Sequence, residues 1–184
     1  MTDPRIARTR DHVLQTAIGM LAVPSGEPLT FSTLAAEAQV SRRTLYVHWG
    51  TMQQILSDII GVRRTRIVVD PSENASPRDI LKEFLTALRN DLHEPVTALA
   101  LTALLSQAAQ DERAADIVLA SSVGGTDEIS SLLGPVTQLQ LSLLIGPLFY
   151  SEFFLRTPAS NAIVDDLVDT GMRTLGLQEL TTSD

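Results

Sequence analysis

The chain has 184 residues with 44% hydrophobic but only 4% aromatic content, a composition that favours helices packed on helices and suffices for one small and one medium domain. It contains no cysteine, which excludes a disulfide scaffold and a thiolate metal site and makes a reducing cytoplasm the expected compartment. No apolar run opens the chain, and the longest apolar stretches, residues 96–105 and 139–150, are shorter than a membrane span, so we expect a soluble protein without a secretion signal or membrane contact.

The N-terminal region is expected to begin with a mobile basic arm over residues 1–8. Its arginines and Arg10 either touch phosphates or are loose, solvated charges. A helix is predicted from Thr9, because apolar residues recur there at helical spacing. This apolar stripe consists of Val13, Leu14, Ala17, Ile18 and Leu21. Proline and glycine over residues 24–28 predict the loop that ends the helix.

Two short helices across a tight turn are predicted next. Thr30 is placed to cap a helix over residues 31–38, and Ser41 is placed to cap a second helix that continues to about His48. Because the break is so short, the two helices must cross steeply, and small and apolar side chains are available for this crossing. They are Leu34, Ala35, Ala38, Val40 and Leu45. The pattern predicts a helix-turn-helix, whose second helix can enter a DNA major groove.

The outer side of the second helix carries Arg42, Arg43 and Tyr46, whereas Leu45 and Trp49 face the other way. The planar guanidinium group of arginine matches the O6 and N7 atoms of guanine and also binds phosphates. Taken alone, these residues fit better as solvated charges and a half-buried tyrosine. The capped turn and the apolar crossing beneath them favour DNA binding instead.

The segment Thr44–Trp49, Thr-Leu-Tyr-Val-His-Trp, together with Leu34-Ala35 and Val40-Ser41, resembles the DNA-binding region of the tetracycline-repressor (TetR) family. The similarity covers about residues 9–56. It implies base-reading positions at Arg42 and Arg43. It further implies backbone contacts from the second helix by Thr44, Tyr46 and His48, and from the preceding helix by Thr30 and Thr33. With the capping Ser41, these residues form the expected DNA-binding surface.

Three positions depart from the family pattern. Gln39 stands where glycine usually provides a positive φ, so we expect a strained but tolerable turn. Trp49 replaces the usual phenylalanine, a substitution of one large hydrophobic ring for another. Met52 replaces a common phosphate-contacting lysine, so that backbone contact is expected to be absent or supplied elsewhere.

The remainder of the chain is predicted to be helical as well. A connector helix is expected over residues 51–69, followed by a linker at residues 70–77 that contains two prolines. Gly124-Gly125 is expected to stop a helix, and Gly146-Pro147 to kink or locally open another. The expected helices cover residues 77–94, 95–109, 111–121, 127–133, 137–155 and 161–175.

The predicted fold is all-α, with a three-helix DNA-binding domain over residues 1–50 and a larger helical domain over residues 70–184 for effector binding and dimerisation. Charge follows this division. Residues 1–66 carry eight arginines against five acids, a net of +3, whereas residues 67–184 carry six bases against seventeen acids, a net of −11. A weakly basic head on an acidic body suits a dimer that places two heads on DNA.

The resemblance implies an effector pocket within the acidic domain, and its apolar lining predicts a small apolar ligand. The same residues fit an ordinary core better. They are Phe84, Leu88, Leu101, Leu105, Phe149, Tyr150 and Phe153. The last two helices have more apolar surface than one domain's core uses, which predicts a symmetric four-helix dimer interface. Its expected residues are Leu144, Leu148, Ile163 and Leu167.

No enzyme, metal or cofactor is predicted. The three histidines lie in separate predicted elements, and no nucleophile, glycine-rich nucleotide loop or paired buried acids stand at catalytic spacing. We therefore expect a dimeric transcriptional regulator of TetR type, a ligand-responsive repressor on a palindromic operator. An alternative is a DNA-bound adaptor whose acidic body recruits a protein, and a helical enzyme is disfavoured.

Overall fold

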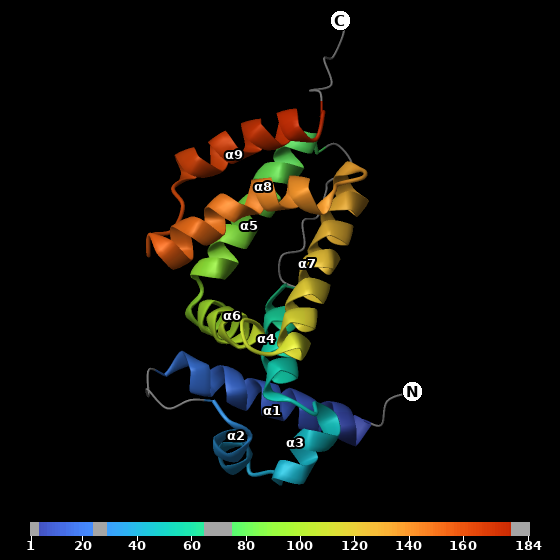
Figure 1. Cartoon of the computed structure of the whole chain (residues 1–184), viewed down its shortest axis with the longest axis vertical. Helices are drawn as coiled ribbons and strands as arrows, with labels where there is room; N and C mark the ends of the chain where they lie inside the picture. The colour runs from blue at the N-terminus through green and yellow to red at the C-terminus, as the bar shows by residue number, and fades with distance from the viewer. Residues whose placement is uncertain (1–3, 24–28, 65–74, 178–184) are drawn as a thin grey trace, which may run out of the picture. The chain divides into compact units, whose positions relative to one another are not determined.

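The computed structural model describes residues 4–23, 29–64 and 75–177, and within these ranges the chain forms helices and turns without any strand (Figure 1). The chain divides into two compact units. The first contains residues 1–63 and 95–118, and the second contains residues 64–94 and 119–184. The predicted all-α fold is confirmed. Grouping of residues 95–118 with the N-terminal unit was not predicted, because such a return of the chain leaves no local signal.

The first unit is built on the predicted three-helix head. Its helices are α1 (Pro4–Ala22), α2 (Phe31–Glu37), α3 (Arg42–His48) and α4 (Met52–Arg64), with α6 (Pro95–Ala108) and the beginning of α7 packed on them. Helix α6 lies against α1, and its Val96, Ala100 and Leu104 join the core. The fully buried side chains of that core from the head are Val13, Ala17, Leu34, Leu45, Ile55 and Ile59. The predicted apolar crossing of the head is thus confirmed.

Helix α1 begins five residues earlier than expected from Thr9, at Pro4. Proline suits the first position of a helix, because its fixed φ is helical and its missing N–H would have no partner there. The Thr9 hydroxyl donates to the Arg5 carbonyl at 3.0 Å within this first stretch. The predicted basic arm is therefore wrong for residues 4–8. Residues 1–3, the loop over 24–28, the connector beyond Arg64 and the linker up to residue 74 lie outside the described residues.

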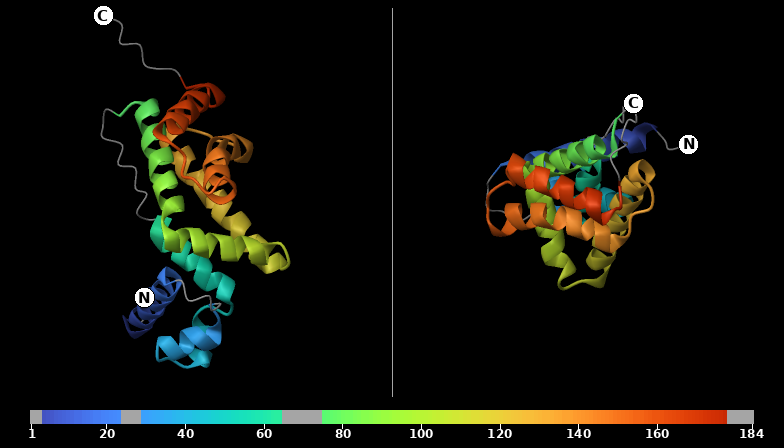
Figure 2. Two further views of the ribbon diagram at one scale, coloured as in Figure 1. Left: turned by 90° about the vertical axis from the view of Figure 1, so that its left-hand side faces the viewer. Right: turned by 90° about the horizontal axis from the view of Figure 1, so that it is seen from above.

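The second unit contains α5 (Pro77–His93), the larger part of α7 (Glu112–Leu133), α8 (Gln138–Phe149), the π-helix η1 (Tyr150–Phe154) and α9 (Asn161–Thr174). Figure 2 shows α5 and α9 lying side by side. The predicted start of α5 at residue 77 is confirmed, since Ser76 is the N-cap and forms a reciprocal capping box with Asp79. The Ser76 hydroxyl donates to the Asp79 carboxylate at 2.6 Å, and this bond lowers the pKa of that carboxyl group.

Helix α7 is one continuous helix, whereas a stop at Gly124-Gly125 and two separate helices were predicted. A glycine within a helix costs roughly 1 kcal/mol relative to alanine, but it ends the helix only where the backbone turns left-handed. That happens at Gly134, with a φ of 88°, directly after Leu133. The expected stop at Gly124-Gly125 is therefore wrong, whereas the expected helix end at residue 133 is found.

Helix α8 changes character after the predicted Gly146-Pro147 site. Pro147 lies inside the helix, and three residues later the chain continues as the π-helix η1, with the Leu155 amide donating to the Tyr150 carbonyl at 3.1 Å. Proline removes one hydrogen-bond donor of the helix and crowds the preceding turn, so a local widening nearby is a natural response. The predicted local opening is therefore found just beyond the proline.

The second unit is held together where α9 meets α5 and α8. Arg78 pairs with Asp169, and Lys82 pairs with Asp165 at 2.9 Å, so two ion pairs join α5 to α9. Between the helices, a Cβ atom on Gly171 would lie 2.9 Å from Leu144 Cδ2 and 3.1 Å from Leu81 Cδ1. Glycine at this position therefore allows the close approach of the helices.

Among the described helices, none is by itself both long and apolar enough to cross a bilayer. The apolar stretch that continues from α7 into α8 and η1 is broken by a bend between the two helices.

We predict that Gly171→Ala is less stable than Gly146→Ala. Both changes favour the helix by up to about 1 kcal/mol, but only the methyl group at residue 171 meets close neighbours, whereas nothing lies within 4 Å of a Cβ at Gly146. Overpacking of this kind costs about 1–3 kcal/mol, which is the expected difference in free energy of unfolding between the variants. Urea denaturation measures it, and equal midpoints would contradict the close packing described.

Candidate nucleic-acid interface

The two helices of the predicted helix-turn-helix begin at the predicted caps. The Thr30 hydroxyl accepts from the Thr33 amide at 3.2 Å, and the Thr33 hydroxyl accepts from the Thr30 amide at 3.0 Å. Ser41 accepts from the Thr44 amide at 3.0 Å. These bonds satisfy amide groups that have no partner within a helix, so they fix where α2 and α3 start. Both predicted N-caps are confirmed.

The turn between α2 and α3 is closed by the expected left-handed residue. Gln39 has a φ of 53°, which confirms the positive φ predicted there. The Val40 amide donates to the Ala35 carbonyl at 3.0 Å across the turn. On the other side, His12 Nε2 donates to the Ala38 carbonyl at 3.0 Å, so α1 also holds this turn. A strained residue persists where its surroundings determine the backbone, and these bonds supply that constraint.

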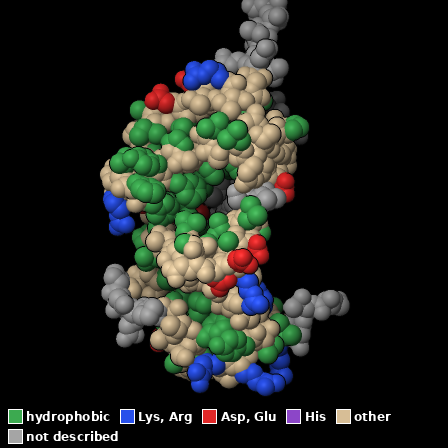
Figure 3. All heavy atoms as spheres, in the orientation of Figure 1, with side chains coloured by type: hydrophobic (Ala, Val, Ile, Leu, Met, Phe, Trp, Pro, Cys, Tyr) green, Lys and Arg blue, Asp and Glu red, His purple; other side chains and the backbone are tan. Residues whose placement is uncertain are grey.

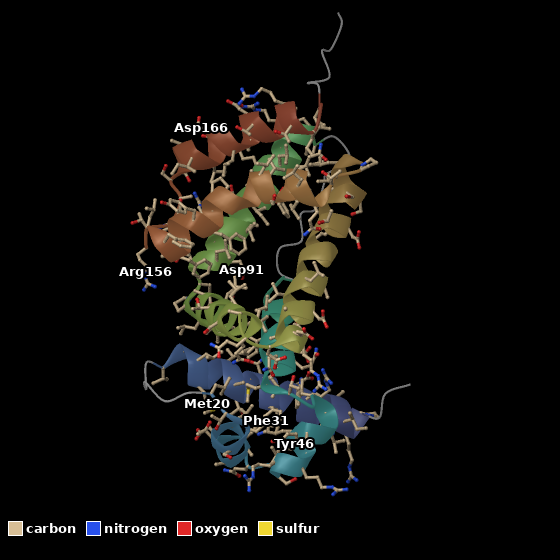
Figure 4. The ribbon with its side chains drawn as sticks, viewed as in Figure 1. Met20, Phe31, Tyr46, Asp91, Arg156 and Asp166 are labelled. Atoms are coloured by element: carbon tan, nitrogen blue, oxygen red, sulfur yellow. The ribbon has the colours of Figure 1, made fainter. Side chains whose placement is uncertain are left out.

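The outer face of α3 is open to solvent. Arg42 and Arg43 are exposed, and basic side chains gather on the surface of the first unit over this helix (Figure 3). Tyr46 is 58% exposed, and its ring meets the edge of Phe31 at a centroid distance of 4.5 Å, which ties α3 to α2 (Figure 4). Leu45 and Trp49 are buried on the opposite side, as predicted. The arginines are thus presented on a rigid, capped support.

Val47 is also exposed on this face of α3, although the sequence did not predict it. It is 73% exposed and lies one helical turn beyond Arg43, on the same side of α3. A branched apolar side chain in that position matches the methyl group of thymine, which is the apolar feature of the major groove. Val47 was not predicted because an apolar residue in a short helix is ordinarily expected to be buried, and only the structure shows that it is exposed.

The other predicted DNA-binding residues lie around α2 and α3. Ser41 is exposed, whereas Thr30, Thr33, Thr44 and His48 are half-buried. The hydroxyls of Ser41 and Thr44 lie 2.8 Å apart, and those of Thr30 and Thr33 lie 3.0 Å apart. All eight predicted residues therefore belong to one helix-turn-helix, and their contacts with DNA stay a prediction.

A polar network behind α3 was not predicted. The Asp58 Oδ2 atom accepts from Trp49 Nε1 at 2.7 Å and from Arg10 Nη2 at 2.5 Å. Arg10 also donates through Nη1 to the His48 carbonyl at 3.1 Å. Arg10 was expected to be a solvated charge or a phosphate ligand, but its side chain is engaged in this network. Its partners lie 38 and 48 residues away along the chain, beyond the reach of local patterns.

The predicted effector-pocket residues are divided between the two units. Leu101 and Leu105 lie on α6 in the first, whereas the other five lie in the second. In the second unit, Phe149 and Phe153 are half-buried with ring centroids 6.0 Å apart, and Tyr150 is exposed and stacked on Phe154. Phe84 is buried in the core and Leu88 is half-buried. A pocket formed by these residues stays a prediction.

The predicted dimer residues need a correction. Leu144, Leu148 and Leu167 are buried inside the protomer, so their side chains are already packed within the second unit. Only Ile163, which is 38% exposed, remains accessible. The apolar periodicity correctly predicted that α8 and α9 pack together. It did not show which side of α8 faces the core of its own protomer. The exposed leucines of α8 are Leu139 and Leu143, at 68% and 52%.

No metal centre is formed by the described residues, within which no group of three or more histidine and acidic side chains comes together. His93 Nδ1 lies 3.2 Å from Glu152 Oε1, an isolated contact between α5 and η1.

Comparison with known proteins supports the predicted resemblance. Residues 15–59 match the model of the bacterial regulatory proteins of the tetR family. These residues include the whole of α2 and α3, so the expected family resemblance is confirmed for the helix-turn-helix. No curated protein matches the chain.

Several solved structures share the fold. A TetR family transcription regulator, SCO0332, is 22% identical, covers 93% of this chain and 99% of its own, and has a TM-score of 0.67. A TetR family transcriptional regulator from Pseudomonas syringae pv. tomato str. DC3000 is 19% identical, with coverages of 93% and 97% and a TM-score of 0.56. The R. erythropolis repressor QsdR is 18% identical, with coverages of 96% and 99% and a TM-score of 0.52. The shared fold extends over nearly the whole chain.

We predict opposite responses to glycine at two exposed glutamines. At Gln39, glycine relieves the strain of the positive φ, which costs other residues about 1–2 kcal/mol, so Gln39→Gly should match or exceed the wild type in stability. At Gln15, within α1, glycine should lower the free energy of unfolding by about 1 kcal/mol. Thermal denaturation compares the two variants, and a larger loss for Gln39→Gly would refute the assigned turn.

Proposed function

We propose that this chain, a TetR-family DNA-binding transcriptional regulator by its N-terminal region, represses transcription by binding a palindromic operator as a dimer and releases it when an effector binds. The observation that carries the proposal is the exposed pair Arg42 and Arg43 on the capped helix α3. Their guanidinium groups fit guanine edges, and the helix is presented so that it can enter a major groove. Val47 adds an apolar contact next to them.

Charge supports the placement of DNA at the N-terminal head, residues 1–66. The chain as a whole has a net charge of −8, which repels nucleic acid, whereas residues 1–66 carry eight arginines against five acids. With so few positive charges on one head, sufficient affinity requires two heads on the same duplex. A two-fold dimer provides them when its recognition helices are about one helical turn of DNA apart, roughly 34–36 Å.

The exposed side of α8 is the surface we assign to the dimer. Leu139 and Leu143 are one helical turn apart and are exposed, as is Ile163 on α9. Isologous pairing of such a face would bury these side chains in both protomers at once. This assignment replaces Leu144, Leu148 and Leu167, which already pack within the protomer.

Regulation by an effector follows from differential binding. An effector that prefers a dimer with unsuitably spaced heads lowers operator affinity by the ratio of its affinities for the two states. The apolar residues Phe149, Phe153 and Leu88 favour a small apolar ligand in the second unit. TetR-family regulators are generally not enzymes, and we propose no catalytic activity here.

A second candidate function rests on the acidic charge of residues 67–184, which carry seventeen acids against six bases. Exposed acids such as Asp116, Asp127 and Asp166 could recruit a basic protein partner while the head stays on DNA. A thermal-shift screen with small apolar compounds distinguishes effector-controlled repression from protein recruitment. Only a protein that binds an effector is stabilised by a ligand that also releases DNA.

We predict that Arg42→Ala and Arg43→Ala each weaken operator binding by about 1–3 kcal/mol per half-site. The operator is obtained by selecting bound duplexes from a random-sequence pool with the wild-type protein. Fluorescence anisotropy at fixed salt then measures affinity, and each variant should lose preference at one base position. Arg113→Ala removes the same charge from an exposed position on α7 and should retain base preference. Unchanged affinity in both α3 variants would remove the base-reading assignment.

We predict that Leu143→Glu dissociates the dimer. Carboxylates placed opposite one another across a two-fold interface repel and lose hydration, which raises the dissociation constant by about 100-fold or more. Sedimentation velocity measures the oligomeric state. Leu119→Glu introduces the same charge at an exposed leucine of α7 and should leave the dimer intact. A dimer that survives Leu143→Glu would place the interface elsewhere.

A further inference from the structure

We propose that Asp58 is a positioning residue for operator binding, because its carboxylate fixes the direction in which α3 projects from the head. The inference rests on the proposed DNA binding. Asp58 itself lies on α4, and its side chain is 22% exposed, behind α3 and away from the face that carries Arg42 and Arg43. It would therefore act through α3 and not by touching DNA.

The carboxylate collects donors from three elements of the first unit. Trp49 Nε1, at the C-cap of α3, donates to Oδ2 at 2.7 Å. Arg10 Nη2, from α1, donates to the same oxygen at 2.5 Å. Gln54 Nε2, one turn earlier on α4, donates to Oδ1 at 3.3 Å. Bonds that involve ionised groups are stronger than neutral ones, and partial burial strengthens them further.

Arg10 extends this network to the backbone of α3. Its Nη1 atom donates to the His48 carbonyl at 3.1 Å, near the end of the helix, and its guanidinium carbon lies 4.9 Å from the centroid of the Trp49 ring. A cation is favourable at a helix C-terminus and over an indole face. The last turn of α3 is therefore bound to α1 and α4 through one carboxylate and one guanidinium group.

Direction matters here because α3 is short. The helix has seven residues and connects to α4 through Trp49, Gly50 and Thr51, with a φ of 71° at Gly50. The buried Leu45 and the Trp49 ring hold α3 against the core, but apolar contacts are non-directional. Hydrogen bonds to Asp58 add the missing angular constraint. Bidentate base contacts need that constraint, whereas phosphate contacts from flexible arginines need it less.

A pair of variants separates positioning from charge. Asp58→Asn and Asp11→Asn both remove one negative charge from the first unit, and Asp11 is an exposed residue of α1. By charge alone, both should bind any duplex slightly more tightly. The specificity ratio is the affinity for the selected operator divided by that for a scrambled duplex of equal length. If Asp58 positions α3, Asp58→Asn should lower this ratio by about tenfold, while Asp11→Asn leaves it unchanged. Trp49→Phe, which keeps the buried ring and removes the donor, should lower the ratio in the same way.

The single tryptophan of the chain supplies a direct readout of the bond. In ¹H–¹⁵N spectra of the full-length protein, the one indole N–H signal should move and exchange faster with water in Asp58→Asn but not in Asp11→Asn. Its resonance also reports on a folded protein without DNA. An unmoved indole signal, or an operator-to-scrambled ratio in Asp58→Asn and Trp49→Phe equal to that of the wild type, overturns the positioning role. Failure of the wild type to select any sequence would instead refute the proposed function.

Discussion

Leu34 and Leu45 are fully buried where α2 and α3 cross, and most of the first unit can be understood from the requirement that these two short helices meet there. Neither helix is long enough to be stable alone, since each has seven residues. Their stability comes from the caps at Thr30 and Ser41 and from the apolar contact between them. The turn is consequently too short for an unstrained path, and Gln39 takes a left-handed conformation.

The same crossing leaves the outer side of α3 largely exposed. Apolar packing uses Leu45 and Trp49, so Arg42, Arg43 and Val47 have to face solvent. Hydrogen bonds then hold the two ends of α3, where apolar packing alone does not fix the helix. His12 holds the turn before α3, and Arg10 with Asp58 holds its end, so α1 constrains the helix at both termini. The exposed face is in this way supported by side chains of α1 and α4.

Local signals in the sequence were sufficient for most helix starts. Thr30 and Ser41 were both predicted as caps, because capping depends on residues only two or three positions apart. Features that depend on distant residues were missed. The ion pair between Arg10 and Asp58 spans 48 residues, and the side of α8 that faces the core depends on α5 and α9. Helix ends were predicted both at Gly124-Gly125 and at residue 133, and only the second is found, because glycine permits a left-handed turn without requiring one.

The candidate DNA surface was predictable because it lies within one continuous segment with a distinctive pattern. Val47 was the exception, since its role depends on exposure and not on residue type. The second unit carries no comparable pattern. The residues proposed there for a pocket and a dimer surface are mostly leucines and phenylalanines, which suit a core, a cavity or a partner equally, and only their positions in space distinguish these roles.

The π-helix between α8 and α9 has a consequence for the second unit. With the Leu155 amide bonded to the Tyr150 carbonyl, this stretch accommodates one residue more than an α-helix would. The helix ends directly after this wide turn, because Leu155 is its C-cap and Arg156 has a φ of 57°. Tyr150 and Phe154 stack within this stretch at a centroid distance of 5.4 Å, so the wide turn ends the helix with two exposed aromatic rings side by side.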